Sequence, residues 1–187
     1  WARQHRVSAE ASLATATAIG LPWPVNYGAR MTAGMHGHVP NQRPFNSVDL
    51  WTSSGRVLAP KAGTYYTTCK RGGSALVHLV HDNGYTTTYY HMEKMPSVDD
   101  GTRVEVGTLL GHVGNALPCG GSSSGAHVHM SLQFNSRPVA LKDKVLGGWI
   151  FHEGWFPYQG YLSRGSQRIY PGSNALVTNY GEDDLGI

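Results

Sequence analysis

The sequence predicts an all-β fold, with an antiparallel sheet or sandwich as its core, long loops and few or no helices. The chain holds 24 glycines and 10 tyrosines in 187 residues, whereas charged residues make up only 14%. Such a composition is typical of short strands joined by tight turns. Asp82-Asn83-Gly84 lies between two runs of β-branched and aromatic residues, which indicates a β-hairpin. No stretch shows the apolar period of a long amphipathic helix.

The chain begins with a segment that we expect to lie outside the main fold. Residues 1–20 are predicted to be a loosely structured lead or a short helix, and residues 21–187 a single domain. The prolines in Leu21-Pro22-Trp23-Pro24 fix the backbone and predict a rigid connection into that domain. From Met31 to Leu50 the glycines and prolines predict an irregular loop, and long irregular loops in compact domains are usually functional.

Most of the expected strands follow this loop. Residues 56–60 and 64–69 predict a first strand pair, and 75–81 and 85–91 the hairpin around Asn83-Gly84. Further strands are expected at 103–106, 109–113 and 127–134. From Pro138 onward the chain is less regular, with aromatic residues spaced by glycine and proline.

Charge and hydropathy exclude two classes of function. The net charge of +3 is too small to favour nucleic acid. The sequence contains no run of about 18 apolar residues, so no transmembrane helix is expected. The first residues lack the continuous apolar core of a signal peptide, as in a mature, processed protein. We therefore expect a secreted protein without a membrane span, and a monomer.

Two cysteines, Cys69 and Cys119, are present. A structural zinc site needs more of them, and neither lies in a Cys-x-x-Cys motif. An even pair in this composition favours one disulfide and an oxidising compartment. A bond between them would close a loop of about 51 residues, which would stabilise the fold by about 4 kcal/mol in the chain-entropy model. The alternative is a pair of buried free thiols.

The segment Gly120 to Phe134 predicts a site with metal or proton chemistry. A Gly/Ser loop runs into an alternating strand, in which side chains two residues apart share a face. His127 and His129 therefore face one way, and Val128, Met130, Leu132 and Phe134 face the other way. Two imidazoles on one face of a strand are able to hold a metal ion, or to divide metal binding and proton transfer between them.

The remaining histidines divide into two groups. Five histidines are expected to be structural or exposed. His5 and His152 have no other candidate ligand in their segments, and no carboxylate lies beside His78, His81 and His112 in the expected strands. The others are His36 and His38 in the loop that also holds Asp49, then His91, and the His127/His129 pair. A hydrolytic zinc site needs three nitrogen or oxygen ligands and an open position. This group is large enough to supply them and to leave two catalytic histidines.

Four ordered motifs carry a family resemblance. They are Gly34-Met35-His36, Phe45-Asn46-Ser47-Val48-Asp49, Thr88-Tyr89-Tyr90-His91-Met92, and the segment from Cys119 to His129. From about Leu21 to about Tyr161 the chain resembles the lysostaphin-type zinc endopeptidases, especially the branch of staphylolysin and the β-lytic proteases. The resemblance implies an all-β domain of the duplicated hybrid motif type with long active-site loops.

The resemblance also implies roles for individual residues. His36, Asp49 and His129 match the family's zinc ligands, for one Zn²⁺ per chain, with His38 as a rival for His36. His91 and His127 match its catalytic histidines, without indicating which one deprotonates water. A tyrosine near the oxyanion maps to Tyr161.

We expect an endopeptidase that cuts glycine-containing bonds in peptidoglycan cross-bridges, or in glycine-rich proteins such as elastin. A narrow cleft walled by rings and main chain, with Tyr90 and Asn115 as substrate-binding residues, would reject bulky residues by clash. The alternative is a catalytically silent relative that binds cell-wall peptides or regulates another hydrolase. Such relatives usually lose a ligand or a catalytic histidine, and this chain retains all of them.

Overall fold

The computed structural model describes residues 14–182. In this part the chain forms strands and no helix, so the predicted all-β class is confirmed, and no described helix is long and apolar enough to cross a membrane. The strands are β1 Thr15–Ile19, β2 Gly28–His36, β3 Ser47–Trp51, β4 Arg56–Leu58, β5 Gly63–Arg71, β6 Ser74–Val80, β7 Tyr85–Tyr90, β8 Thr102–Val104, β9 Leu109–His112, β10 Val128–Phe134, β11 Arg137–Pro138, β12 Lys144–Leu146, β13 Trp149–His152, β14 Tyr161–Arg164, β15 Gln167–Ile169 and β16 Val177–Thr178.

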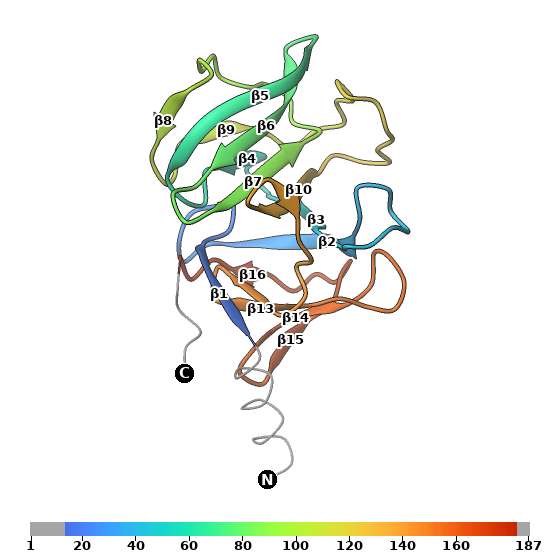
Figure 1. Cartoon of the computed structure of the whole chain (residues 1–187). Coiled ribbons are helices and arrows are strands. Elements are labelled where there is room, and N and C mark those ends of the chain that lie inside the picture. The colour runs from blue at the N-terminus through green and yellow to red at the C-terminus, as the bar shows by residue number, and fades with distance from the viewer. Residues whose placement is uncertain (1–13, 183–187) are drawn as a thin grey trace.

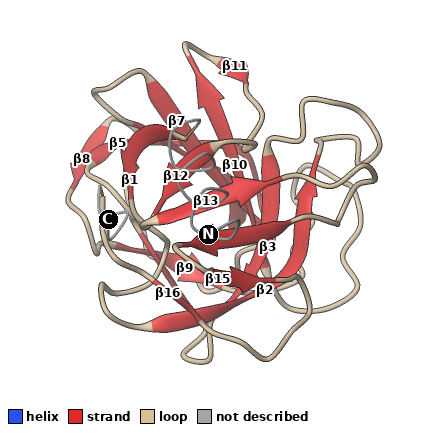
Figure 2. Ribbon diagram, turned by 90° about the horizontal axis from the view of Figure 1, so that it is seen from below, coloured by secondary structure: helices blue, strands red, loops and turns tan. Residues whose placement is uncertain are grey.

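Two large sheets build the domain. A 9-stranded sheet has the order β16-β2-β3-β10-β7-β6-β5-β8, with β11 added to β10, and a 5-stranded sheet has the order β1-β12-β13-β14-β15. Strands β4 and β9 form a separate pair. Figure 1 shows the smaller sheet below the larger one, and Figure 2 shows its strands from below. Among these pairings only β1 with β12 is parallel, so the antiparallel prediction holds.

The core forms where strand alternation directs apolar side chains inward. On β10, Val128, Met130 and Leu132 are buried as predicted, whereas Phe134 at the strand end is 40% exposed and packs against Tyr85. The hairpin prediction is also confirmed, because Gly84 adopts a φ of 89° in the turn between β6 and β7. That left-handed conformation is readily accessible to glycine.

Three predictions about local structure were wrong. Residues 15–19 of the expected lead form β1 in the smaller sheet, while residues 1–13 lie outside the described part. The expected irregular loop from Met31 to Leu50 contains most of β2 and most of β3. Gly34 lies where the β2–β3 ladder shifts register between Ala33 and His36, so it marks a bulge and not the absence of a strand. The expected pair of strands at 56–60 and 64–69 does not form, because β4 pairs with β9 whereas β5 pairs with β6 and β8. The less regular tail after Pro138 contains strands β12 to β16.

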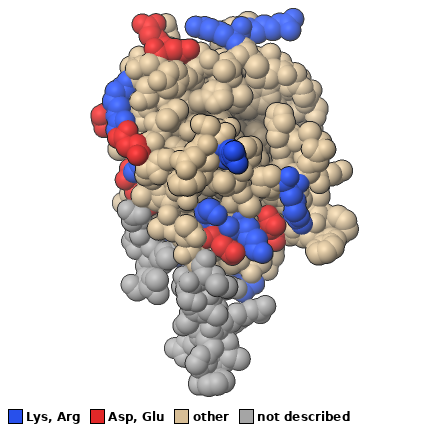
Figure 3. Space-filling model, in the orientation of Figure 1, with Lys and Arg blue, Asp and Glu red and all other residues tan. Residues whose placement is uncertain are grey.

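Three irregular segments project on the same side of the molecule, at the right of Figure 1. They are residues 37–46 after β2, 114–126 before β10, and 153–160 between β13 and β14. Most of the face in Figure 3 is neither basic nor acidic, and its charged side chains stand mainly near the edges. This face therefore shows no extended basic patch of the kind that binds nucleic acid.

Candidate active site

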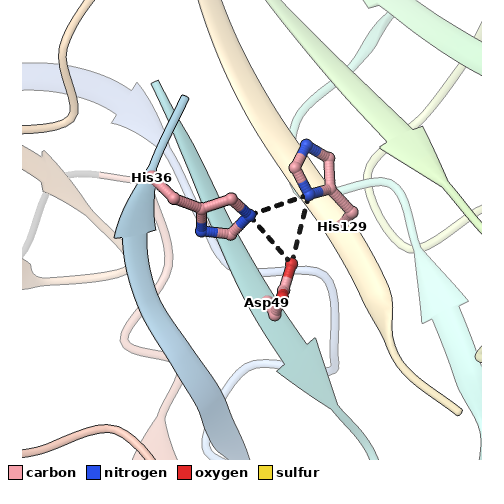
Figure 4. A group of neighbouring side chains, drawn as sticks. All are labelled: His36, Asp49 and His129. Atoms are coloured by element: carbon pink, nitrogen blue, oxygen red, sulfur yellow. Dashed lines mark hydrogen bonds and ion pairs between the residues drawn. The ribbon is translucent and has the colours of Figure 1, made fainter. Parts of the chain in front are cut away.

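Three adjacent strands bring a possible metal-binding group together. Asp49 on β3 is paired with His129 on β10 in the strand register, and β2 runs beside β3 and ends at His36. The two register shifts between β2 and β3 alter the direction in which His36 leaves its strand. Figure 4 shows the three side chains meeting between these strands. Neighbouring strands thus unite residues that lie far apart in sequence.

The contacting atoms of this group are close to one another. The distance from His36 Nε2 to His129 Nδ1 is 3.1 Å, from His36 Nε2 to Asp49 Oδ1 3.4 Å, and from His129 Nδ1 to Asp49 Oδ1 3.2 Å. The Nδ1 atom of His36 lies 2.8 Å from the carbonyl oxygen of Gly34. That hydrogen bond fixes the tautomer and leaves Nε2 with a lone pair directed at the other two residues.

The surroundings set the charges of the group. Burial alone would raise the pKa of the Asp49 carboxyl, but hydrogen bonds with His129 and His36 outweigh burial and hold that pKa well below its usual range. Burial lowers the pKa of His129, although Asp49 opposes this shift. At neutral pH the group therefore holds an ionised carboxylate and a neutral imidazole, the forms that coordinate a metal.

Two more histidines stand beside the group. His91 directly follows β7, where its backbone adopts a φ of 69°, an uncommon conformation for a residue with a side chain. Its ring lies 4.7 Å from that of His127 and 6.1 Å from that of His129, measured between centroids. The Nε2 atom of His127 lies 3.6 Å from Asp49 Oδ1. As predicted from strand alternation, His127 and His129 face the same carboxylate.

Backbone carbonyls orient both of these rings. Nδ1 of His91 lies 2.9 Å from the Ala116 oxygen, and Nδ1 of His127 lies 2.7 Å from the Gly125 oxygen. Each Nδ1–H donates to its carbonyl, so each Nε2 is free to accept a proton. Burial is the main cause that lowers the pKa of His91, which keeps this ring neutral near pH 7. The pair thus presents two candidate general bases.

The segment 114–126 is tied to the site in several ways. Cys69 and Cys119 form a disulfide, so the predicted bond is present and the alternative of buried free thiols is wrong. The Tyr90 hydroxyl donates to the Gly120 oxygen at 2.6 Å and accepts from the Cys119 amide at 2.8 Å. Asn115 accepts from the Ser123 hydroxyl at 2.7 Å. Tyr90 and Asn115, predicted to bind substrate, therefore both stabilise this segment.

The structure places a different tyrosine at the site from the one expected. The Tyr161 ring stacks on that of His152 at 4.3 Å and lies 5.5 Å from that of Tyr170. Tyr158 instead contacts His36, with ring centroids 4.5 Å apart. Burial, and secondarily the charge of Asp49, raise the pKa of Tyr158, so its hydroxyl remains protonated and able to donate.

The close approach of two backbones explains the position of Tyr158. The Gly34 amide donates to the Tyr158 oxygen at 3.0 Å, and the Tyr158 amide donates to the Met35 oxygen at 3.0 Å. A Cβ atom on Gly34 would lie 1.9 Å from the Gln159 oxygen, so only glycine fits there. The long-range pairing of Met35 with Gln159 has no signature in the sequence, which is why Tyr158 was missed.

Comparison with known proteins identifies the family. The profile of peptidase family M23 matches residues 43–141, more than half of the chain. The chain belongs to peptidase family M23. The predicted resemblance to the lysostaphin-type endopeptidases is thereby confirmed.

Similar M23 proteins come from sequence and structure comparisons. Protease LasA of Pseudomonas aeruginosa is 30% identical over 168 residues, which are 86% of this chain and 40% of that protein. Beta-lytic metalloendopeptidase of Lysobacter enzymogenes is 31% identical over 140 residues, 70% of this chain and 73% of the relative. A structure described as the novel M23 metalloprotease pseudoalterin from the deep sea is 28% identical, with a TM-score of 0.75 over 86% of this chain and 97% of that one.

The His36, Asp49 and His129 atoms of this M23 chain fit a tetrahedral zinc ion. Zinc with nitrogen and oxygen ligands at about 2.0–2.2 Å requires ligand atoms about 3.3–3.6 Å apart. The three distances here are 3.1, 3.2 and 3.4 Å, one within this range and two within about 0.2 Å of it. These residues form the possible metal-binding group of the described chain. His38 is exposed in the turn after β2 and lies outside this group.

Proposed function

We propose that this chain is a secreted zinc metalloendopeptidase that hydrolyses glycine-containing peptide bonds, with peptidoglycan cross-bridges as its main substrate. The observation that carries the proposal is the convergence of His36 Nε2, Asp49 Oδ1 and His129 Nδ1 within 3.4 Å of one another, beside two further histidines with a free Nε2. Membership in a metallopeptidase family supports the reaction class. The disulfide supports an oxidising compartment.

In this proposal, zinc is held by His36, Asp49 and His129. When bound, zinc supplies a Lewis acid for the scissile carbonyl and lowers the pKa of water toward neutrality. The Asp49 carboxylate offsets one of its two positive charges, and its low pKa keeps that charge in place over the working pH range. The carbonyl oxygen of Gly34 holds His36 in the tautomer that zinc requires.

His91 and His127 divide the proton transfers. One ring accepts the proton of the attacking water at its Nε2 atom and delivers it to the amine nitrogen as the C–N bond breaks. The other ring, protonated at Nε2 from solvent, donates a hydrogen bond to the carbonyl oxygen as that atom gains charge. A centroid distance of 4.7 Å brings both rings to the same reacting bond. The protonated Tyr158 hydroxyl provides a further donor at the opposite edge, next to His36. In this role Tyr158 replaces Tyr161.

The glycine preference is supported by the chemistry of the surrounding segments. Residues 114–126 present mostly main chain and small side chains, including Gly120, Gly121 and Gly125. A peptide with little side chain at the scissile bond would approach such a surface closely, whereas a bulky residue would clash. Glycine-rich proteins such as elastin fall within the same chemical class.

Cleavage of defined peptides tests the proposal. The purified chain is incubated with pentaglycine and with matched peptides that carry Ala, Leu or Lys on either side of the central bond, and kcat/KM is compared. We expect Gly-Gly to be cleaved fastest and a chelator to abolish cleavage. Equal rates for the Leu- or Lys-flanked bonds would refute the glycine preference. Stoichiometric zinc without hydrolysis of any peptide would instead favour the catalytically silent relative.

A further inference from the structure

Large rings stand exposed beside the site, in the segment 153–160 between β13 and β14. Trp155 is 82% exposed and Phe156 61% exposed, and Trp155 is the most exposed of the large hydrophobic side chains in residues 14–182. Single exposed apolar residues are common on protein surfaces, but adjacent large rings form an apolar patch that usually marks a binding site. Neither ring has a role in the proton transfers proposed above.

The backbone that carries these rings is fixed in place. Tyr158 and Gln159 are hydrogen-bonded to Gly34 and Met35 at the end of β2. On the other side, the Arg43 guanidinium donates to the Trp155 carbonyl oxygen at 3.2 Å. Pro157 further restricts the backbone of its own residue and of the one before it. The exposure of Trp155 and Phe156 is therefore a fixed feature of the fold, since this backbone cannot readily turn the rings inward.

Trp155 and Phe156 lie close in the chain to a residue that contacts the site. Tyr158 contacts His36, and Trp155 and Phe156 precede Tyr158 by three and two residues. Three residues of chain reach at most about 10 Å. A substrate peptide is extended by about 3.3 Å per residue, so a substrate residue two or three positions from the scissile bond falls within the same reach.

The charged side chains at segment 153–160 are paired with each other. Arg43 and Glu153 form an ion pair at 3.4 Å, and the Arg43 guanidinium also lies 4.1 Å from the centroid of the Phe45 ring. The most exposed large side chains of segment 153–160 are therefore the uncharged rings of Trp155 and Phe156. Such rings favour an apolar or aromatic side chain over a charged one, because ring contacts gain from the burial of apolar surface.

We propose that Trp155 and Phe156 form a subsite for a large apolar side chain, two or three residues from the scissile bond on one side of it. This inference rests on the proposed function, because it assumes a peptide substrate at His36, Asp49 and His129. The peptide itself is the expected occupant, since its chain continues from the reacting bond past Tyr158. The preferred substrates then combine a glycyl bond with a large apolar residue at that distance.

The test uses peptides with a central Gly-Gly bond and Phe, Leu or Ser at the second or third position on each side. The ratio of kcat/KM for Phe over Ser is measured with the wild-type chain and with Trp155→Ser/Phe156→Ser. Each single variant is prepared as well, and zinc content reports folding. Tyr27→Ser is the matched control, because Tyr27 is also an exposed ring, at 67%. It precedes the first residue of β2, whereas His36 is the last residue of that strand, so the length of β2 separates Tyr27 from the metal group.

At one of the four substituted peptide positions, we expect the wild-type chain and Tyr27→Ser to cleave the Phe peptide with a kcat/KM about tenfold higher than the Ser peptide, in keeping with apolar pockets generally. The preference should fall to about one in the double variant. A ratio independent of the amount of active protein makes the comparison robust to partial misfolding. A wild-type chain without the preference, or a double variant that retains it, would overturn the subsite.

The experiments also distinguish two other ligands of the Trp155/Phe156 patch, and they distinguish failure of the subsite from failure of the proposed peptidase function. Loss of binding to soluble glycan strands with an unchanged peptide ratio would assign the patch to sugar. A concentration-dependent dimer that the double substitution abolishes would assign it to a second copy of the chain, and either result overturns the proposal. Cleavage of the Ser-flanked Gly-Gly peptide tests the proposed function separately. If no peptide is cleaved, calorimetric binding of the Phe and Ser peptides decides the subsite by the same comparison.

Discussion

The Nε2 atom of His36 and the Nδ1 atom of His129 lie 3.1 Å apart, although 93 residues separate them along the chain. Asp49 Oδ1 lies within 3.4 Å of both. The hydrogen bond from His36 to Gly34 leaves a lone pair on Nε2, and the carboxylate oxygen only accepts. Two acceptors and a second imidazole nitrogen thus face one point, which is an arrangement that a cation stabilises.

The first prediction separates the catalytic histidines from the metal ligands. His91→Ala and His127→Ala should keep zinc, because neither ring belongs to the group of His36, Asp49 and His129. Each should lower kcat by about 10² to 10⁴, as expected for a group that transfers protons. Zinc content and steady-state kinetics check this on the same preparations. Loss of zinc from the His127 variant would mean that both members of the pair bind metal.

The second prediction concerns the contact between β2 and the segment that carries Tyr158. In Gly34→Ala the new Cβ would lie 1.9 Å from the Gln159 oxygen, so that segment must move and carry Tyr158 away from His36. We expect a loss of stability of about 1–3 kcal/mol and a lower kcat/KM. Gly125→Ala is the control for stability, because its Cβ meets no atom within 4 Å. Equal unfolding temperatures of the two variants would contradict this packing argument.

The third prediction concerns the disulfide. Replacing both Cys69 and Cys119 by Ser should lower the free energy of unfolding by about 2–4 kcal/mol. Zinc should remain bound, since both cysteines lie outside the metal group. Activity should fall moderately, because the segment 114–126 also supplies the carbonyls that orient His91 and His127. Urea unfolding and kcat/KM measure the two effects, and unchanged stability would contradict a stabilising role of the disulfide.

The fourth prediction concerns a buried histidine outside the site. His81 is 2% exposed, and its ring contacts the Ala62 carbonyl and the Thr87 hydroxyl, each at 2.9 Å. Burial is the main cause that lowers its pKa, and Lys61 adds to this, while the Ala62 carbonyl and the acidic groups Glu182 and Asp82 oppose it. The unfolded chain therefore binds a proton at His81 more tightly than the folded chain does.

The sign of this linkage follows directly. The contribution of neutral His81 to stability is fully present above the unfolded pKa of about 6.5 and is lost as pH falls through the lower pKa of the folded state. The urea midpoint should decrease on acidification, and less steeply in His81→Gln, with exposed His38→Gln as control. An NMR titration of the His81 ring should give a midpoint below that of a free histidine. A midpoint above it would reverse the sign and contradict the prediction.

Local patterns predicted part of the site. Alternation along the strand predicted that His127 and His129 share a face, and both do lie within 3.6 Å of Asp49. Asn83-Gly84 predicted the hairpin, because its geometry depends on residues that are adjacent in sequence. The cysteine count predicted the disulfide without its surroundings.

Long-range pairing accounts for what the sequence did not predict. The glycines around His36 indicated a loop, because a bulge and a loop look alike without the partner strand. Tyr158 was overlooked in favour of Tyr161, since the approach of segment 153–160 to Gly34 depends on a backbone contact between residues more than a hundred positions apart. The subsite proposed at Trp155 likewise depends on exposure, which composition alone cannot reveal.

The measurement that tests the central claim most directly is zinc per chain in the wild type, His36→Ala and His38→Ala, together with peptide hydrolysis before and after chelation. Three ligands at tetrahedral spacing predict one zinc in the wild-type and His38→Ala chains, and loss of both metal and activity in His36→Ala. Adding zinc back after chelation should restore hydrolysis by the wild type. A His36→Ala chain that keeps stoichiometric zinc, or a wild-type chain that cleaves peptides equally well without metal, would contradict the account.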